Sequence, residues 1–275
     1  MKSVNYFLSI VAFLLVLTVS AQEKLKGNRI VTTENRGNFD FEKIEIGDGI
    51  DVLISQGDET SVSVEADENL MDAIITEVNN NTLTIKLSEE IRSKKELKVL
   101  VTANSLLNQI TIKDKSDITS NSTLFLDSFT LNAEGDSKVS LNLDVIHFYL
   151  NNNESANVNL SVKGEEVYLK ANKTGKGKVN ISADKVEVIT QGSSSLELTG
   201  ECKSLNIKAE NRSNARAAEL ETEETIVTSS DTSNAFVNAK IKLTVSAINS
   251  SEVSIYGQPQ IIIEKFADKA ILRKK

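Results

Sequence analysis

Hydrophobic positions in the second half of the chain recur with one fixed, short period. Stepping by 19 from residue 112 meets a branched aliphatic residue eight times in succession: Ile112, Leu131, Leu150, Leu169, Val188, Ile207, Ile226 and Val245. The same step from residue 117 meets only polar residues: Asp117, Asp136, Ser155, Thr174, Ser193, Arg212, Asp231 and Ser250. A fixed short period indicates stacked structural repeats. We therefore predict that residues 19 apart are vertical neighbours and share one environment.

Each 19-residue unit alternates apolar and polar positions as strands do, with polar corners between the strands. A second inward column is predicted at Leu141, Leu160, Val179, Leu198, Ala217, Phe236 and Ile255. A unit of this length is too short for a strand–helix–strand crossover. The predicted fold is therefore all-β, a right-handed parallel β-helix formed by one chain, with three short strands and three corners per coil. The competing fold is an antiparallel β-sandwich, which would not require an uninterrupted period.

The chain divides into five parts along its length. Residues 1–21 have the features of a secretory signal peptide, described below, and residues 22–36 form a polar lead-in. The β-helix domain is expected over 37–263: residues 37–104 make an irregular N-terminal β portion or cap, and residues 105–263 make the regular coils. The segment 264–275 reads as a charged C-terminal tail that protects the exposed strand edge.

The first residues of the chain predict export. Lys2 precedes a short apolar run, and small residues end it before a cleavage site between Ala21 and Gln22. The run is too short for a membrane anchor, and no later segment has 18 consecutive apolar residues, so no membrane span is predicted. The expected location is the periplasm or the cell surface.

Composition narrows the classes of partner. Without Lys2, the 30 remaining Lys and Arg residues face 39 Asp and Glu residues, a net charge near −9. An acidic chain with few aromatic residues is a poor binder of nucleic acid. Cys202 is the one cysteine, so no disulfide can form within the chain. Because it falls in a column of small residues, we predict a buried structural thiol.

The first predicted strands carry a recognisable motif, Phe41-x-x-Ile44-x-Ile46-Gly47-x-Gly49-Ile50-Asp51-Val52-x-Ile54-x-Gln56-Gly57. It resembles the opening of the head GIN domain family, exported bacterial proteins labelled auto-transporter adhesins and common in Bacteroidetes. Recurring Gly-Ser or Asp-Ser corners and the closing segment at residues 253–259 fit the same family. The resemblance covers about residues 37–263. It implies a β-helical fold and an exported location, and it supplies no catalytic motif. Many corners that would hold Gly-Ser in the family hold Asn, Lys or Glu here, as at Asn153-Glu154-Ser155.

No catalytic residues, metal site or cofactor are predicted. His147 is the one histidine, and it falls at a corner in phase with Ser128, Glu166 and Lys185. An acidic cluster is formed by Glu219, Glu221, Glu223 and Glu224. The period places Lys240 after Glu221 and Lys242 after Glu223, so we interpret these side chains as cross-coil ion pairs. Calcium ligation is the alternative for the cluster, although the glycine-rich calcium repeats of secreted β-rolls are absent.

The outward column of the first strand is the predicted ligand-binding surface. It reads Thr111, Thr130, Tyr149, Tyr168, Glu187, Asn206, Thr225 and Thr244. Tyr149 and Tyr168 should lie one above the other, where exposed aromatic rings can stack on sugars. The alternative is that tyrosine and threonine simply suit strands.

The sequence therefore predicts an exported, non-enzymatic adhesin or surface-binding module for a glycan or a cell-surface protein. Two alternatives stay open. One is a carbohydrate-active β-helix enzyme that uses the acidic cluster at 219–224. The other is a structural protein that assembles end to end. The oligomeric state is left open.

Overall fold

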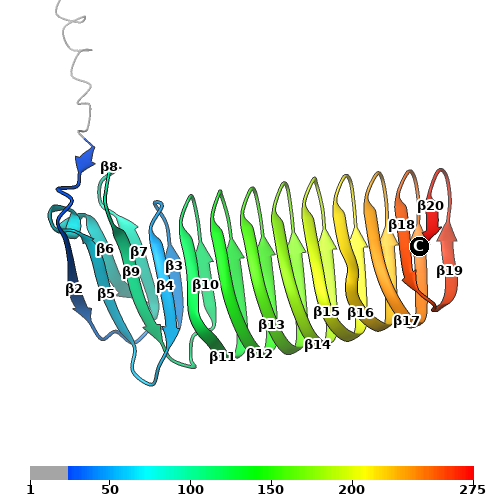
Figure 1. The fold of residues 1–275 in the computed structure, drawn as a ribbon, viewed down its shortest axis with the longest axis horizontal. Coiled ribbons are helices and arrows are strands. Elements are labelled where there is room, and N and C mark those ends of the chain that lie inside the picture. The colour runs from blue at the N-terminus through cyan, green and yellow to red at the C-terminus, as the bar shows by residue number, and fades with distance from the viewer. Residues whose placement is uncertain (1–23) are drawn as a thin grey trace, which may run out of the picture.

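The computed structural model describes residues 24–275 and shows a rod built almost entirely of β-strands (Figure 1). The predicted signal peptide and its cleavage site between Ala21 and Gln22 lie outside the described residues. No helix among residues 24–275 has the length and apolarity that crossing a bilayer requires.

The body of the rod consists of long strands that each pair in parallel with the next. They are β11 (Asp117–Ala133), β12 (Lys138–Asn152), β13 (Asn157–Ala171), β14 (Lys176–Thr190), β15 (Ser195–Ala209), β16 (Asn214–Ser229) and β17 (Asn234–Ala247). Leu131 is in register with Leu150, and Leu150 with Leu169, so each step matches the predicted period. This register confirms the predicted parallel β-solenoid and rules out the β-sandwich.

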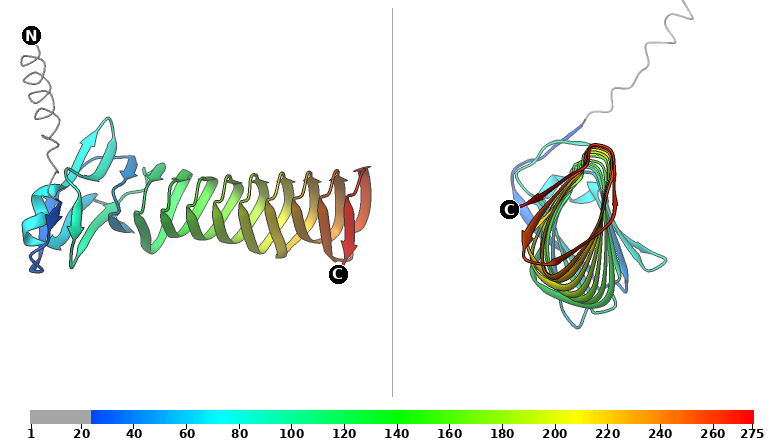
Figure 2. Two further views of the ribbon diagram at one scale, coloured as in Figure 1. Left: turned by 90° about the horizontal axis from the view of Figure 1, so that it is seen from above. Right: turned by 90° about the vertical axis from the view of Figure 1, so that its right-hand side faces the viewer.

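Each coil has one sharp corner, and the rest of it is a single continuous strand. In β12 the pairing with β13 runs from Lys138 to Val145, omits Ile146, and continues from His147 to Asn152. The third short segment predicted for each unit is thus part of a bend in one strand. The cross-section is a flattened oval (Figure 2).

The interior is filled by columns of aliphatic side chains. Leu131, Leu150 and Leu169 have no exposed surface. The rings of Phe129 and Phe148 stack with centroids 6.1 Å apart and planes 13° apart. Parallel pairing satisfies the backbone groups of inner strands without helices, while the stacked side chains supply the apolar burial that stabilises the rod.

The predicted period is interrupted in one coil, and this corrects several predicted columns. Between β15 and β16 the register gains one position, because Ala217 and Ala218 occupy the space opposite Leu198. One extra residue reverses which side chains face inward. Val227 therefore stacks on Ile207, whereas the predicted core residue Ile226 is 51% exposed. The inward position predicted for Phe236 and the outward one predicted for Thr225 are wrong for the same reason: Val237 and Thr225 are the buried residues.

The first coil also departs from the predicted spacing. Ile112 is in register with Ala133, and Ile110 is the residue that pairs with Leu131. Asp117 lies on β11 opposite Lys138, so it does not belong to the corner column predicted from it. Two additional residues in β11, Asn121 and Ser122, account for the longer step, and the register returns to the predicted period after them.

The N-terminal portion starts the solenoid and closes its end. Its elements are β1 (Leu25–Lys26), β2 (Val31–Gly37), β3 (Lys43–Ile46), β4 (Asp51–Gln56), β5 (Ser61–Asp67), η1 (Glu68–Ala73), β6 (Ile74–Asn79), β7 (Thr82–Leu87), β8 (Ile91–Ser93), β9 (Leu97–Ala103) and β10 (Gln109–Ile112). Strands β2, β5 and β9 pair antiparallel, as do β6 and β7. The 3-10 helix η1 buries Leu70, Met71 and Ala73 against the core. The predicted polar lead-in at 22–36 is thus largely strand, because β1 and most of β2 fall within it.

At the other end the chain forms a final coil. β18 (Glu252–Gly257) and β19 (Gln260–Phe266) both pair with β17, and β20 (Ile271–Lys274) pairs with β18. The segment 264–275, predicted as a tail, therefore contributes strands to the last coil. Val253 and Ile255 on β18 are buried, whereas the isoleucines and Phe266 of β19 and Ile271 on β20 are exposed.

Candidate binding surface

Tyr149 on β12 and Tyr168 on β13 are directly paired on the outer face of the rod. Their ring centroids are 6.2 Å apart and their planes are tilted by 44°. Tyr149 is 43% exposed, and Tyr168 is partly buried. Burial and the neighbouring Glu187 carboxylate raise the pKa of the Tyr168 hydroxyl. The structure thus brings together the two residues that the period predicts as neighbours.

Amide side chains line the same face next to the tyrosines. The Nδ2 of Asn151, two residues after Tyr149, donates to Oδ1 of Asn132 at 2.9 Å. Asn132 in turn donates to Oγ1 of Thr111 at 3.3 Å. These hydrogen bonds fix the amides in a row along the rod. We name the surface formed by Thr111, Asn132, Tyr149, Asn151 and Tyr168 the tyrosine face.

The tyrosine column continues differently from the prediction beyond Asn206. Ile226 follows Asn206 on the outer surface, because the extra residue in β16 turns Thr225 inward. Thr225 accepts or donates a 2.6 Å hydrogen bond with Thr222 in the interior. Ile226 therefore interrupts the polar column at one coil, and Thr244, which is in register with Ile226, follows at the predicted position.

One of the two predicted cross-coil ion pairs of the acidic cluster, Lys240 with Glu221, is present. Lys240 contacts Glu221 at 2.5 Å, and this hydrogen bond together with the charge of Glu221 raises the pKa of Lys240. Lys242 is in register with Glu224, one residue from the predicted partner Glu223. Among residues 24–275 the side chains of His, Cys, Asp and Glu form no group of three or more that could hold a metal ion.

Cys202 is buried next to this cluster. It lies in register between Ala183 and Thr222 and borders a shallow hollow of about 400 Å³. Only 6% of the residue is exposed, and burial raises the pKa of its thiol to about 12. At that pKa the thiol is protonated at neutral pH, which removes the nucleophilic form.

His147 lies at the bend of its coil, as predicted. Its Nδ1 is 3.5 Å from Oε2 of Glu166, and the other carboxylate oxygen of Glu166 is 3.4 Å from Nζ of Lys185. The three residues are in register on successive coils. Glu166 and Lys185 form an exposed ion pair at the bend, of the kind that contributes little to stability.

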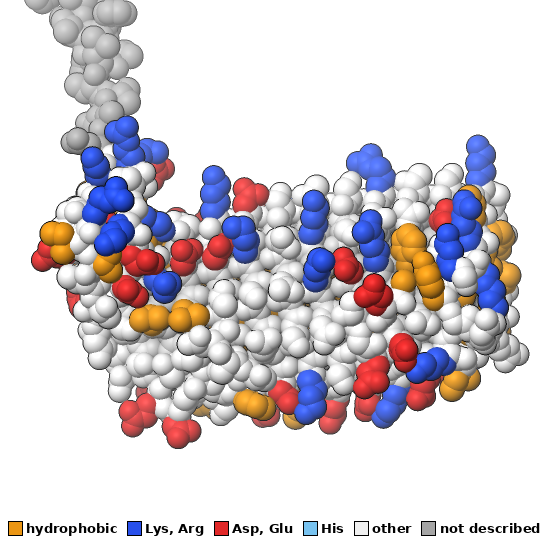
Figure 3. Space-filling model, viewed as in Figure 1, with side chains coloured by type: hydrophobic (Ala, Val, Ile, Leu, Met, Phe, Trp, Pro, Cys, Tyr) orange, Lys and Arg blue, Asp and Glu red, His pale blue; other side chains and the backbone are white. Residues whose placement is uncertain are grey.

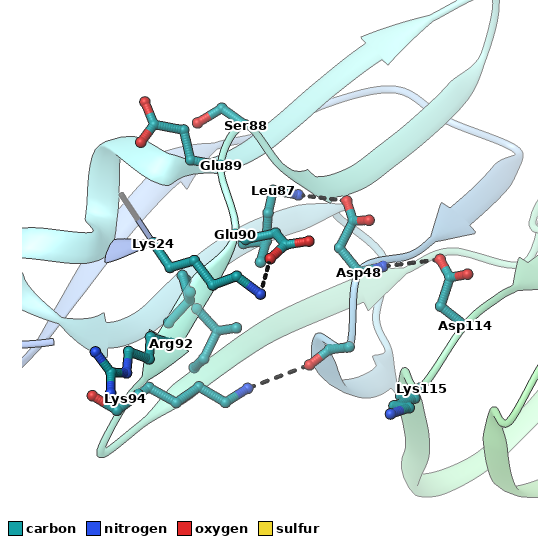
Figure 4. A pocket seen from close by; sticks show the side chains of 14 residues that line it. Lys24, Asp48, Leu87, Ser88, Glu89, Glu90, Arg92, Lys94, Asp114 and Lys115 are labelled. Atoms are coloured by element: carbon teal, nitrogen blue, oxygen red, sulfur yellow. Dashed lines mark hydrogen bonds and ion pairs between the residues drawn. The ribbon is translucent and has the colours of Figure 1, made fainter. Parts of the chain in front are cut away.

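A cavity of about 950 Å³ lies where the N-terminal portion meets the first coils (Figure 4). Acidic and basic side chains line it in equal number. Its inner wall is fixed by hydrogen bonds: Leu87 N donates to Oδ2 of Asp48 at 2.9 Å, and Asp48 N donates to Oδ2 of Asp114 at 3.3 Å. Lys94 reaches across it to the carbonyl oxygen of Gly49 at 3.3 Å. These hydrogen bonds connect the N-terminal portion of the fold to the first coils.

A second hollow at the same junction was not predicted from the sequence. It has a volume of about 800 Å³ and is bordered by Leu106 and Phe125, which are 64% and 60% exposed. The side-chain amide of Gln56 donates to the carbonyl of Phe125 and accepts its N–H, both at 2.8 Å. The alternation of Leu124, Phe125 and Leu126 could have shown that the phenylalanine points outward.

Two overlapping segments of the chain, residues 40–175 and 149–259, match the family model described as "Putative auto-transporter adhesin, head GIN domain". Together they span most of the chain. The chain belongs to this family. The resemblance predicted from the Phe41–Gly57 motif is thereby confirmed.

Solved structures share the fold of this head GIN domain. A putative adhesin from Parabacteroides merdae has a TM-score of 0.69 at 16% identity, covering 92% of this chain and 99% of that one. A putative adhesin from Parabacteroides distasonis has a TM-score of 0.68 at 19% identity, covering 91% and 100%. A putative lipid binding protein from the same species has a TM-score of 0.66 at 17% identity, covering 92% and 100%. No curated protein matches the chain.

The geometry of the corners shows why residues other than glycine are tolerated where the family pattern has Gly-Ser. Gly135 and Gly192 sit at the left-handed position of their corners, where a Cβ would lie 2.8 Å from backbone atoms of the corner below. Other corners place Glu154, Asn211 or Asp231 there, also with φ near +60°. These longer side chains hydrogen-bond the preceding corner: Glu154 accepts from Gly135 N at 3.1 Å, and Asp231 from Asn211 N at 3.1 Å. The hydrogen bond offsets the strain that a non-glycine residue has at positive φ.

Proposed function

We propose that this chain is a non-catalytic binding module, exported to the periplasm or the cell surface, which binds a glycan on its tyrosine face. The observation that carries the proposal is the exposed Tyr149–Tyr168 pair, whose rings lie 6.2 Å apart on neighbouring coils. The adhesin description of the family supports a role in binding a surface partner.

The chemistry of the face suits a sugar chain. Tyrosine rings offer apolar surface for the CH-rich face of a pyranose, and their hydroxyls remain available as hydrogen-bond partners. The amides of Asn132 and Asn151 lie beside the rings and can exchange their mutual hydrogen bond for bonds to sugar hydroxyls. Successive coils repeat about every 4.8 Å, so the face is long and straight. Because strands hold these side chains in place, little conformational entropy would be lost on binding.

The acidic cluster is a weaker candidate for a functional site than the tyrosine face. Glu221 is neutralised by Lys240, and Cys202 behind the cluster is protonated. Glycoside hydrolysis would need two carboxyl groups that face each other across a bound sugar, whereas Glu221 faces an ammonium group on the next coil. We therefore assign the cluster a role in joining successive coils.

The proposal is tested on a glycan array with the chain from residue 22 to residue 275. The double variant Tyr149→Ala/Tyr168→Ala should lose binding by about tenfold or more, the loss expected when stacking on an aromatic pair is removed. Phe125→Ala is the matched control, because it removes an exposed aromatic ring from a different part of the rod. An array with no bound glycan, or equal losses in both variants, would contradict the proposal.

A further inference from the structure

The C-terminal end of the rod exposes what is core in every other coil. Ile261, Ile263 and Phe266 on β19 are 39%, 52% and 46% exposed. The residues in register with them one coil earlier, Leu243, Val245 and Ala247, have no exposed surface. β19 pairs only with β17, and β20 only with β18, so among residues 24–275 the edges of β19 and β20 that face away from the rod have no strand partner. This end is therefore an apolar surface bordered by free backbone donors and acceptors, which favours pairing with another strand.

The N-terminal end is built differently. Helix η1 closes the core there, and the outermost strands are β2 on one face and β6 on the other (Figure 1). Within the described residues, β2 pairs only with β5, and β6 only with β7. Each of these two strands thus has one edge free. The two ends of the rod differ in shape, but both offer strand edges.

The C-terminal end is basic, whereas the charged side chains of η1 at the N-terminal end are acidic. Residues 260–275 combine two acidic residues with five basic ones, Lys265, Lys269, Arg273, Lys274 and Lys275, for a net charge of +3. Figure 3 shows basic and apolar side chains together at this end. At the other end β2, η1 and β6 combine one basic residue with four acidic ones, Glu34, Glu68, Asp72 and Glu77, while Lys24, Lys26 and Arg29 precede β2 in the same part of the fold. Two C-terminal ends, both basic, would repel each other, whereas a basic C-terminal end and the acidic side chains of η1 attract.

Strand direction also allows unlike ends to join. β2 is antiparallel to β5, β5 is antiparallel to β9, and β9 is parallel to β4 and so to the strands that lead to β18 and β20. β2 therefore runs in the same direction as β20 on the same face of the rod. A second copy displaced along the rod axis would set its β2 parallel to β20, and its β6 antiparallel to β19. Both arrangements form regular backbone hydrogen bonds.

We propose that the open C-terminal coil binds the N-terminal end of a second copy of this chain, so that rods stack head to tail. The contact covers Ile261, Ile263 and Phe266 and sets the basic end against the acidic surface of η1. Because the two surfaces differ, the contact does not close on itself, and further copies can add in a line. The stacking does not depend on the tyrosine face, which lies on the side of the rod.

Sedimentation velocity of residues 22–275 tests this stacking over a range from about 10 μM to about 500 μM, where a weak self-contact is populated. At low salt, species larger than one copy should grow with concentration, and added salt should reduce them because the ends attract by charge. Ile263→Lys should abolish the growth. Ile226→Lys is its matched control: Ile226 is 51% exposed against 52% for Ile263, but it lies on the side of the rod.

Blocking the other end makes the direction of stacking measurable. Glu68→Lys/Asp72→Lys reverses the charge of η1 at two exposed side chains and should also give single copies. A mixture of this variant with Ile263→Lys leaves one intact end of each kind. The mixture should form a species of two copies and nothing larger.

Three results would overturn the proposal. The first is a single copy at every concentration and salt level. The second is a two-copy species that survives in Glu68→Lys/Asp72→Lys alone, because this would show that two C-terminal ends join each other. The third is equal loss of association in Ile263→Lys and Ile226→Lys. Glycan binding by the Ile263→Lys variant separates this proposal from the proposed function, because single copies keep the tyrosine face.

Discussion

The carboxylate of Asp67 accepts the backbone N–H of Arg29, which lies 38 residues earlier in the chain, at 3.0 Å. The same side chain accepts the N–H groups of Lys95 and Glu96, each at 3.1 Å. A Cβ on Gly27 would lie 1.9 Å from its Oδ2, so only glycine leaves room there. Asp67 thus ties the first residues of the fold to the loop before β9.

Acidic pH should weaken the hydrogen bonds that Asp67 accepts and so destabilise the N-terminal portion of the fold. Burial by itself would raise the pKa of Asp67, but the hydrogen bonds from Glu96, Arg29 and Lys95 outweigh it and lower the pKa below the ordinary 3.8. A carboxyl group whose pKa is lowered by folding stabilises the fold above its ordinary pKa, and that stability is lost as the pH falls through the folded value. We expect the free energy of unfolding to decline below about pH 4, and Asp67→Asn to be less stable at pH 7 with a smaller decline.

Urea unfolding of the wild type and Asp67→Asn at a series of pH values measures both effects. Asp72→Asn, an exposed aspartate on η1, serves as the control and should follow the wild type. An Asp67→Asn variant with the same stability and the same acid response as the wild type would show that the buried carboxylate contributes nothing to folding.

The 19-residue period predicted most of the stacked pairs in the rod, because most neighbouring coils are in register at that spacing. Tyr149 and Tyr168 meet, and Glu166 contacts Lys185, since β12, β13 and β14 follow each other at the predicted period without a shift. In such a region, residues that are one period apart in the sequence stack on each other in space. A pair of residues can then be placed without any knowledge of distant contacts.

The error at Ile226 has a specific cause. The step from Ile207 to Val227 is one position longer than the period, and the step from Val227 to Val245 is one position shorter. The two deviations cancel, so Val245 returns to phase and the sequence gives no sign that the coil between them is shifted. An aliphatic residue also stands at 226, next to the true core position. Only backbone pairing distinguishes the two.

The parts that depend on distant segments could not be predicted. The hollow beside Phe125 forms because Gln56, 69 residues earlier, holds its backbone by two hydrogen bonds. The open end of the last coil is invisible in the sequence, since Ile261 and Ile263 have the same apolar pattern as any inward strand. Their exposure follows because no strand among residues 24–275 covers them, and no local sequence pattern indicates this.

Gly175 and Asn152 should be energetically coupled. A Cβ on Gly175 would lie 3.0 Å from the backbone oxygen and from Oδ1 of Asn152, whose Nδ2 donates to the carbonyl of Lys176 at 2.7 Å. Gly175→Ala should cost about 1–3 kcal/mol by overpacking this corner. With Asn152→Ala the corner would resemble the one below, where residues 133 and 156, also 23 apart, are both alanine. The double variant should lose about 0.5–3 kcal/mol less than the sum of the single variants.

Denaturant unfolding of the two single variants and the double variant completes this cycle. The comparison is internal, because Asn152→Ala alone shows the cost of the lost hydrogen bond. Strict additivity would show that the corner relaxes around the added methyl group and that the close approach has no energetic effect.

The stacked phenylalanines should contribute much more than the exposed one. Phe129 and Phe148 have no exposed surface and stack at 6.1 Å, so Phe148→Ala should cost about 3–5 kcal/mol through lost burial and the cavity left behind. Phe125→Ala, at a side chain that is 60% exposed, should change stability by only about 0.5 kcal/mol. Thermal unfolding followed by circular dichroism distinguishes the two. Similar melting curves for both variants would mean that the aromatic stack does not hold the first coils together.

Cys202 should resist alkylation in the folded protein. Burial raises the pKa of its thiol from 9.0 to about 12, so at pH 8 its thiolate fraction is about a thousandfold below that of an unperturbed thiol. Because the thiolate is the reacting species, iodoacetamide should label the native chain very slowly at pH 8 and the urea-unfolded chain at the ordinary rate. Mass spectrometry over a time course gives both rates. Fast labelling of the native chain would mean that the bend around residues 202–204 opens, since neither the 6% exposure nor the raised pKa permits it in the closed coil.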